Sequence, residues 1–512
     1  MAVCVLAVAV ARYAVVDGRA GRGTAGRDVE VIQTNADLSQ RLTRLRDLSF
    51  GSARLSGLPV IHVDDQARYQ PVTGFGAAMT DTAAWLLYDR LSPAARARAM
   101  SDLFGAAGIH LNFLRLPIGA SDFTYNRTPY SYDDLPLGGS DRRLLGFSVA
   151  HDEAYIVPVL RQMLAINPRV EILAMPWSPP AWMKANQSLD NRSNSGLLLG
   201  SMRATWARYF VKFIQAYARL GIRIAAVTPQ NEPTNPTRYP GLDLESAREA
   251  RMITEFLRPA LHRAGLRAGI YGGDVGWDAR SAPFTRVIGG QVVNLQSGRA
   301  YVDSLVSGQG ASSLDGVAWH CYYGSPDVMS RLHRMAPGLR QVVDECSPGI
   351  APVTASELVI SAVRNWASAV ALWNLALDPR GGPVEPPNQG CPTCTGVLTV
   401  KERTRAVSFS HAYFELGQAS EFVAPGARRI ASEHFVSYDY KGPGTSYVTQ
   451  GLDDVAFRNP NGSKVLVAYD NSSSSIRFAV AWRGHSFTYT LAPKATVTFV
   501  WDRPASARRS AL

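Results

Sequence analysis

The stretch VEILAMPW, residues Val170–Trp177, is followed after one amphipathic segment by IRIAAVTPQ, residues Ile222–Gln230, and this alternation decides the fold class. Similar short apolar runs recur from Val72 to Leu375. Runs that are apolar at most positions are typical of strands covered on both faces, and hence of parallel strands. Eight are found, at Val72–Met79, Ile109–Pro117, Val170–Trp177, Ile222–Gln230, Arg267–Gly272, Gly316–Tyr322, Arg340–Glu345 and Ala369–Leu375.

Helical patterns fill the segments between these strands. Ser92 and Pro93 form an N-cap followed by a first-turn proline, and Gly105 ends that helix. A later apolar stripe begins at Trp206 and stops before Gly221. Eight successive strand–helix units predict an α/β fold, a (β/α)8 or TIM barrel. A doubly wound open sheet is the alternative, but no G-x-G-x-x-G follows the first strand.

The end of the chain has a different pattern, in which polar and apolar residues alternate with a period of two. Asn461-Gly462 is a hairpin turn between two such segments. Val29–Thr34 also has a strand pattern, and we expect it to join the C-terminal strands in an attached antiparallel β-sandwich-like domain built from both chain ends. The C-terminal strands are predicted at Val455–Phe457, Lys464–Tyr469, Arg477–Trp482, Ser486–Leu491 and Thr496–Trp501.

These patterns divide the chain of 512 residues into four parts. Residues 1–26 are a possible signal peptide or disordered segment, and 27–70 hold the N-terminal strands of the β domain. The catalytic barrel spans 71–420, and the C-terminal β domain spans 421–505. The segment Asp378–Gly396 after strand eight is rich in Gly and Pro, so we expect a long loop on the active side of the barrel.

Composition excludes several classes of protein. With 46% hydrophobic and 19% charged residues the chain can bury a large core, which excludes a disordered protein. No apolar run approaches the ~20 residues of a membrane span, so no stable membrane insertion is expected. The net charge of +11 comes from arginines interleaved with acids rather than from a dense basic stripe, so no nucleic-acid partner is expected. Nothing in the sequence sets the oligomeric state.

The first residues suggest export. Met1–Val16 is apolar apart from Arg12, and Ala2–Ala11 has the length of the apolar region of a signal peptide. The usual positive charge before this region is missing. We therefore expect a secreted protein with an atypical signal, and the cytoplasmic alternative stays open.

Catalytic groups of such a barrel gather at the C-terminal ends of its strands. Glu232 follows predicted strand four and Glu345 ends predicted strand seven, so two carboxylates are expected to face one mouth. Polar and aromatic side chains lie at or just beyond the ends of the neighbouring strands. They are Arg115 and Asp122 at strand two, Trp177 at strand three, Asn231 before Glu232, His320 and Tyr322 at strand six, and Trp373 at strand eight.

Two facing carboxylates are what the hydrolysis of a glycosidic bond requires. One protonates the departing oxygen, and the other attacks the anomeric carbon or activates water. Each residue also has a plainer explanation, because a strand-end Glu can pair with an arginine. Trp177 and Trp373 can be core residues, and His320 can be a hydrogen-bonded core histidine. Two glutamates on these strands, with Asn231 directly before one of them, favour the catalytic interpretation.

Asp344 directly precedes Glu345 and is a second candidate at the end of strand seven. Because side chains alternate along a strand, only one of the two neighbours is expected to enter the barrel mouth. The alternation does not say which of them does so.

Five motifs together resemble glycoside hydrolase family 30, the glucosylceramidase-like enzymes, over nearly the whole chain. The resemblance implies a retaining mechanism, with Glu232 as the acid/base and Glu345 rather than Asp344 as the nucleophile. The carboxyl groups of retaining enzymes lie roughly 5–5.5 Å apart. The motifs are GFGAAMTD at Gly74–Asp81, LRLPIGASDF at Leu114–Phe123, MPWSPPAWMK at Met175–Lys184, TPQNEP at Thr228–Pro233 and WNLALDPRGGP at Trp373–Pro383.

The resemblance also implies what the surrounding residues do. It implies neither a cofactor nor a metal. The glycone would be held by Asp122 and Trp177, closed on its far side by Trp373 and contacted at its 2-hydroxyl by Asn231, while Arg115, His320 and Tyr322 would orient or tune Glu345.

The function expected from this resemblance is a retaining β-glycosidase that is glucosylceramidase-like, acting on a β-glucoside, a glycolipid or an oligosaccharide. An endo-β-1,6-glucanase and a β-xylosidase of the same family are the alternatives. A non-catalytic carbohydrate-binding barrel is a rival of a different class, but it should have lost one of the two glutamates, and both are present.

The five cysteines are too few for a disulfide scaffold in a chain of this length. Cys391 and Cys394 lie in the loop after strand eight, where we expect a local disulfide. Free thiols are the alternative, because a structural zinc site needs four ligands and no second pair of this kind exists. We expect Cys321 and Cys346 to be small strand-end fillers, and Cys4 to leave with any signal peptide.

Overall fold

The computed structural model describes residues 28–502 apart from 53–54, 193–194, 234, 279–284, 289–290, 295–297, 308–309, 349, 352, 386–392, 434–437, 441–445 and 449–450. The possible signal segment, with Cys4, lies outside the described residues, and so does Cys391. No helix in the described part of the chain is long and apolar enough to cross a membrane.

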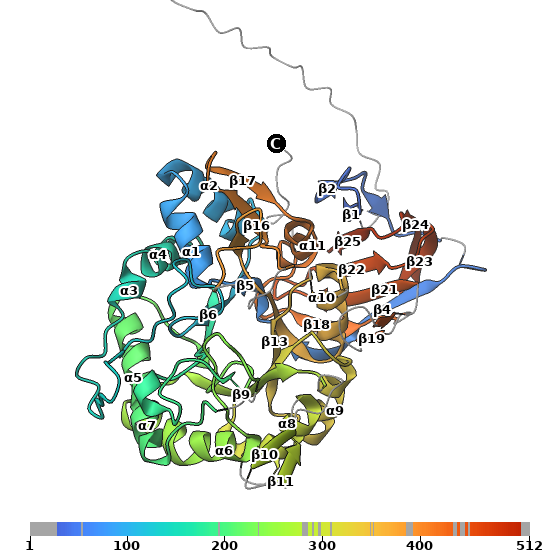
Figure 1. The fold of residues 1–512 in the computed structure, drawn as a ribbon. Helices are drawn as coiled ribbons and strands as arrows, with labels where there is room; N and C mark the ends of the chain where they lie inside the picture. Colours follow the sequence, from blue (N-terminus) through green and yellow to red (C-terminus); the bar gives the residue numbers. More distant parts are fainter. Residues whose placement is uncertain are drawn as a thin grey trace, which may run out of the picture.

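Eight parallel strands close into a barrel, which confirms the predicted fold class (Figure 1). Strand β13 has the predicted bounds, but β8 is much shorter than its prediction. Pro229 lacks the N–H that a strand needs, so the chain leaves the ladder soon after Val227. The strands are β5 (Gly74–Ala78), β6 (Phe113–Pro117), β7 (Glu171–Met175), β8 (Ala226–Val227), β9 (Gly269–Gly276), β12 (Gly316–His320), β13 (Arg340–Glu345) and β14 (Ala367–Leu372).

Helices surround this barrel, as the amphipathic patterns predict. The Ser92 hydroxyl accepts a hydrogen bond from the Ala95 amide at 3.2 Å, and Gly105 ends the helix that Ser92 begins. The elements are α1 (Asp81–Asp89), α2 (Pro93–Phe104), α3 (Ala150–Glu153), α4 (Ile156–Ile166), η1 (Ala181–Met183), η3 (Gly200–Met202), α5 (Arg203–Arg219), α6 (Ser246–Arg251), η4 (Met252–Leu257), α7 (Arg258–Arg263), α8 (Gly298–Val306), η5 (Ala311–Ser313), α9 (Asp327–Met335), α10 (Ala355–Arg364) and α11 (His411–Ser420).

Both ends of the described chain build one ten-stranded sheet, as predicted. Val31 of the first strand pairs with Phe499 of the last in an antiparallel ladder. The sheet is mixed rather than purely antiparallel, because β4 pairs in parallel with β23. Its strands are β1 (Asp28–Thr34), β2 (Thr43–Arg44), β3 (Leu48–Ser49), β4 (Val60–Pro71), β18 (Arg428–Ala431), β21 (Leu452–Arg458), β22 (Lys464–Asp470), β23 (Ile476–Trp482), β24 (His485–Leu491) and β25 (Thr496–Trp501).

Three small sheets complete the described chain. One of them, β15–β16–β17, flanks the predicted loop Asp378–Gly396, because β15 ends just before it and β16 begins just after it. The described residues of that segment hold no strand. The small strands are β10 (Thr285–Ile288), β11 (Gln291–Asn294), β15 (Ala376–Leu377), β16 (Leu398–Lys401), β17 (Ala406–Phe409), β19 (Tyr438–Tyr440) and β20 (Ser446–Val448).

Helices α10 and α11 join the barrel to the β domain and lie between the two in Figure 1. The Ser356 and Thr496 hydroxyls lie 2.7 Å apart across this junction. Gln418 of α11 donates to the Thr34 hydroxyl of β1 at 2.8 Å, and its side-chain carbonyl accepts from the Thr498 hydroxyl of β25 at 2.6 Å. One buried side chain therefore ties the barrel to both ends of the chain.

Candidate active site

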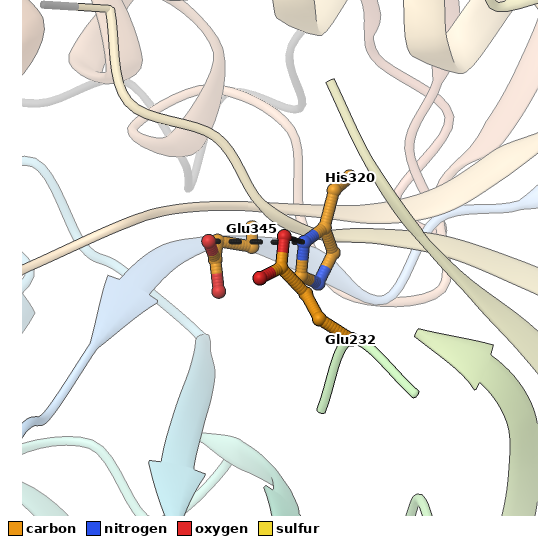
Figure 2. Close-up of side chains that lie close together, drawn as sticks. All are labelled: Glu232, His320 and Glu345. Atoms are coloured by element: carbon orange, nitrogen blue, oxygen red, sulfur yellow. Dashed lines mark ion pairs between the residues drawn. The ribbon is translucent and has the colours of Figure 1, made fainter. Parts of the chain in front are cut away.

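Glu232 and Glu345 meet at the mouth of the barrel, at the C-terminal ends of its strands. One carboxylate oxygen of each, with one ring nitrogen of His320, form a group whose atoms all lie within 4.8 Å of one another. Figure 2 shows the three side chains directed toward a common point. The side chain of Glu345 is 8% exposed and that of Glu232 is 25% exposed. The two predicted carboxylates thus share one space that small molecules can reach.

Glu345 is held by two of the three residues expected to orient it. Arg115 donates from Nη1 to Glu345 Oε2, and the Tyr322 hydroxyl donates to Oε1 at 2.9 Å. The third residue, His320, places Nδ1 3.7 Å from Oε1. Burial and the charge of Glu345 raise the pKa of Tyr322 well above its usual value, so Tyr322 stays a hydrogen-bond donor.

Glu232 is held by different contacts. Its Oε2 accepts from Asn235 Nδ2 at 2.7 Å, and its Oε1 lies 3.4 Å from His320 Nδ1. The backbone of Glu232 has φ +42°, a conformation that residues other than glycine rarely adopt. Such conformations concentrate at functional sites, where the surrounding structure compensates for their cost.

Asp274 is a functional residue that the sequence reasoning missed. It lies in β9, is fully buried, and accepts from Arg115 Nη2 at 2.9 Å and from His320 Nε2 at 2.7 Å. Burial alone would raise the pKa of Asp274, but Arg115 and His320 offset this and hold it below its usual value. The prediction ended this strand at Gly272. A lone acid in the otherwise uncharged run GIYGGDVG was the signal that could have revealed it.

Asp344 also points into the site, which corrects the expectation that only one of two neighbours enters the mouth. Asp344 Oδ2 accepts from Arg115 Nε at 3.0 Å, so Asp344 and Glu345 contact the same guanidinium. The reason is a register shift. Trp319 pairs with Val343, but His320 pairs with Glu345, which leaves Asp344 as an extra residue in β13. Burial and the charge of Asp274 raise the pKa of Asp344 to about 7.

Charge at the base of the site is close to balanced. Arg115 is completely buried among Asp274, Asp344 and Glu345, and these anions raise its pKa against the effect of burial. Burial would lower the pKa of His320, but Glu345 and Asp274 raise it well above its usual value. The positively charged form of the ring, with a proton on both nitrogens, is therefore favoured. His320 was expected to orient or tune Glu345. Because this cation faces both glutamates, we extend its expected role to Glu232.

Within the described ranges, two groups of side chains have the composition of a metal site, namely Glu232 with His320 and Glu345, and Asp274 with His320 and Asp344. Metal ligation requires an unprotonated imidazole and free carboxylate oxygens. Here Arg115 and protonated His320 already supply the positive charge that these acids need. The chemistry of the donor set therefore fits an ion-pair network better than a cation site.

The residues expected to hold the glycone surround the same mouth. Trp177 and Trp373 stack with ring centroids 5.2 Å apart. Asn231 Oδ1 accepts from Arg115 Nη2 at 2.6 Å, which fixes the orientation of its amide. Asp122 is 7% exposed, and its Oδ1 has no hydrogen-bond partner among the described residues. Burial and the charge of Glu345 raise the pKa of Asp122 well above its usual value. A buried polar atom of this kind is suited to a ligand hydroxyl.

Cys321 and Cys346 form a disulfide, so the expectation that they only fill space at strand ends was wrong. They follow β12 and β13, which are neighbours in the barrel, and their Cα atoms lie 5.2 Å apart, within the range of disulfides. Cys346 directly follows Glu345, and Cys321 lies between His320 and Tyr322. Cys394 is also disulfide-bonded. Its expected partner, Cys391, lies outside the described residues.

A closed (β/α)8 barrel with two opposed carboxylates at its mouth is the arrangement of a glycoside hydrolase. Residues 72–258 match the glycosyl hydrolase family 30 TIM-barrel domain, and residues 426–499 match the family 30 beta sandwich domain. The chain belongs to glycosyl hydrolase family 30 and is a retaining glycosidase.

Relatives of known activity match most of the chain. Endo-1,6-beta-D-glucanase neg1 of Aspergillus fumigatus is 32% identical, over 87% of this chain and 88% of its own length. Lysosomal acid glucosylceramidase of Mus musculus is 27% identical, over 91% and 88%. Among solved structures, the endo-beta1,6-glucanase BT3312 has a TM-score of 0.75 and 26% identity, covering 93% of this chain and 100% of that one.

Proposed function

We propose that this glycosidase is an endo-acting β-1,6-glucanase that uses Glu345 as nucleophile and Glu232 as acid/base. The observation that carries the catalytic part is the meeting of the two carboxylates within 4.8 Å at the barrel mouth. This separation supports direct attack by Glu345, because inverting enzymes hold their carboxyl groups ~6.5–9.5 Å apart to admit a water molecule.

In the first step, a Glu345 oxygen bonds to the anomeric carbon as the glycosidic bond breaks, and Glu232 gives its proton to the departing oxygen. The products are a glycosyl ester on Glu345 and a free alcohol. Arg115 and Tyr322, which hold the two Glu345 oxygens, keep the carboxylate aimed at the carbon.

In the second step, Glu232 takes a proton from water, and the water oxygen attacks the anomeric carbon. Glu345 then leaves as a carboxylate, and the sugar keeps its anomeric configuration. The ester no longer carries the negative charge of Glu345, so an ionised Glu232 is easier to accommodate than before. His320, which faces both glutamates, is suited to stabilise whichever one is charged.

The choice of substrate rests on the relatives. Those at 32% identity are named endo-1,6-β-D-glucanases, from Aspergillus fumigatus and Trichoderma harzianum, whereas those named glucosylceramidases reach 27%. The alternative drawn from the sequence therefore has better support than a glucosylceramidase. A polysaccharide substrate also fits a secreted enzyme, and we propose export on the basis of the apolar segment at Ala2–Ala11.

Four substrates separate the candidates, namely β-1,6-glucan, glucosylceramide in mixed micelles, an aryl β-glucoside and an aryl β-xyloside. We expect β-1,6-glucan to give the highest kcat/KM, with a rapid early fall in polymer length as internal bonds are cut. A preference for glucosylceramide or the xyloside would contradict this specificity. The rates of the wild type are also compared with those of Glu345→Gln. If the wild type is no faster on any of the four substrates, the protein is a binding barrel without catalysis.

A further inference from the structure

A pocket of about 520 Å³ adjoins the glycone residues and is used by none of the steps above. We call it the side pocket. Its wall comes from the loops after β6, β7, β8 and β14, and its volume is within the range of small-molecule sites. Strands β9 and β12 carry Asp274 and His320, and the loops that follow these strands contribute no described residue to the pocket. Residues that line it include Arg127, Gln187, Asp190, Arg192, Tyr239 and Glu385.

Two contacts join residues of the side pocket to residues of the glycone site. The Glu385 amide donates to the Asp122 carbonyl at 2.8 Å, which places these two acids side by side. Tyr239 packs against the apolar cluster that contains Trp177 and Trp373. A ligand in the pocket would therefore lie next to the sugar that Asp122 holds, on the side of Asp122 rather than of the leaving group.

Glu385 gives the side pocket a binding group. It is 5% exposed, and its Oε1 has no hydrogen-bond partner among the residues that the structure describes. Such a buried oxygen costs free energy unless a ligand or water pairs with it. Burial raises the pKa of Glu385 to about 7. Both of its forms can bond a hydroxyl group, so a sugar hydroxyl fits this oxygen, while Arg127, Arg192 and Arg238 line the same pocket.

The wall of the side pocket is held in place by a buried lysine. Lys184 donates from Nζ to the carbonyls of Leu189 at 2.8 Å, Asp190 at 2.7 Å and Gly241 at 2.6 Å. These bonds join the loop after β7 to the loop after β8. On the rim, Arg192 pairs with Asp190 at 2.7 Å. The pocket is thus formed before any ligand arrives, which lowers the entropic cost of binding.

We propose that the side pocket binds a second neutral hexose, joined to the glycone on the side away from the scissile bond, and that Glu385 hydrogen-bonds it. This inference rests on the proposed β-1,6-glucanase function, because in a β-1,6-linked chain the preceding sugar is attached to the exocyclic oxygen of the glycone. Glu385 is then a specificity residue that favours internal over terminal bonds.

The test compares two substrates with the same leaving group, an aryl β-glucoside and the aryl glycoside of the β-1,6-linked glucose disaccharide. For each, the rate of release of the aryl group is measured, and the disaccharide must be released intact. In the wild type, we expect a higher kcat/KM for the disaccharide. The Glu385→Ala change should lower the ratio of the two kcat/KM values about ten- to a hundredfold, the effect of losing one hydrogen bond to a charged group. Glu385→Gln keeps a hydrogen-bonding oxygen and should lower it less.

A matched control is Glu402→Ala, which removes a surface carboxylate paired with Arg90 and should leave the ratio unchanged. No preference for the disaccharide in the wild type would overturn the inference, and so would an unchanged ratio in Glu385→Ala or equal losses in the Ala and Gln variants. Failure of the proposed function is read separately, from β-1,6-glucan. An enzyme that does not cut this polymer internally contradicts the proposed function, whichever ratio the two aryl glycosides give.

Discussion

Arg115 is the residue on which the charges of the site converge. Its guanidinium contacts Asp274, Asp344 and Glu345 and also the amide of Asn231. A buried arginine with three carboxylates is expensive to desolvate, and it is retained where its fork of donors fixes several groups at once. In this site it fixes Glu345, the proposed nucleophile, and the amide that is expected to contact the sugar.

In the proposed mechanism, the glycosylation step needs Glu232 only where the leaving group requires a proton. Glu232→Ala should lower kcat/KM by about a hundred- to ten-thousandfold for β-1,6-glucan or an alkyl glucoside, which leave poorly. An activated aryl glucoside, which leaves without protonation, should be affected far less in the glycosylation step. The measurement is kcat/KM over a series of aryl glucosides of graded leaving-group pKa. Equal losses along the whole series would contradict the assignment of Glu232.

His320 provides a second residue-level prediction. Its protonated ring faces Glu232 and Glu345 and is itself held by Asp274, with Arg115 and Asp344 close by. His320→Gln removes this positive charge, so protonation of either glutamate becomes easier. Both limbs of the pH profile of kcat/KM should therefore move to higher pH. Aryl glucoside hydrolysis measures this, and limbs that stay in place or move to lower pH would rule the role out.

Sequence patterns identified Glu345 because it ends a predicted strand, and Glu232 and Asp122 because they lie in quoted motifs just after predicted strands. They did not reveal Asp274, because it belongs to no quoted motif and lies beyond the predicted end of its strand. The missing information was the register of the barrel, which alone determines that β9 brings a carboxylate to Arg115 and His320.

Strand β13 shows how an irregular element builds the site. An extra residue at Asp344 lets two successive acids reach Arg115, where a regular strand would turn one of them away. The Cys321–Cys346 disulfide then links the ends of β12 and β13. Glu345, His320 and Tyr322 therefore all lie within one residue of a covalent cross-link.

Removing this cross-link should affect both stability and catalysis. The Cys321→Ala/Cys346→Ala protein should lose about 3 kcal/mol of unfolding free energy, as expected for a disulfide separated by 25 residues. Its kcat should fall more than its KM rises, because Glu345 and Tyr322 lose a shared support. Thermal unfolding and kinetics with an aryl glucoside measure the two effects.

Ser347→Ala is the control for that change, since it alters the residue after Cys346 without touching the disulfide. It should leave kcat and the unfolding temperature nearly unchanged. A disulfide-free variant with wild-type kcat would show that the cross-link does not position Glu345.

The elements themselves were largely predictable, and the exceptions have physical causes. Strand β13 and the helix after Ser92 match their predictions, because apolar runs and capping residues are local signals. Strand β4 was not identified as a separate element. Its sequence VIHVDDQARYQP carries many polar residues, and it pairs with β18 and β23, which lie far away in the chain.

The first and last described strands join the two domains, because β1 and β25 pair and helix α11 of the barrel packs on both. Expecting both ends in one domain was possible from strand patterns alone. Which barrel helix would receive them was not, since the hydrogen bonds of Gln418 to Thr34 and Thr498 join residues separated by most of the chain.

Gln418→Leu tests whether barrel and β domain unfold together. The change leaves the buried Thr34 and Thr498 hydroxyls without this partner, which should cost about 1–3 kcal/mol. Calorimetry should show one transition at a lower temperature than in the wild type. Two separate transitions, with the upper one at the wild-type temperature, would mean that the junction does not couple the domains.

Trapping the glycosyl ester tests directly which carboxylate attacks the anomeric carbon. A 2-deoxy-2-fluoro β-glucoside with a good leaving group forms its glycosyl ester quickly and releases it slowly, so the labelled residue can be read by mass spectrometry of peptides. We predict a single adduct, on Glu345, together with β-configured product from ordinary substrate. An adduct on Asp344 or Glu232, or an inverted product with no adduct, would contradict this mechanism.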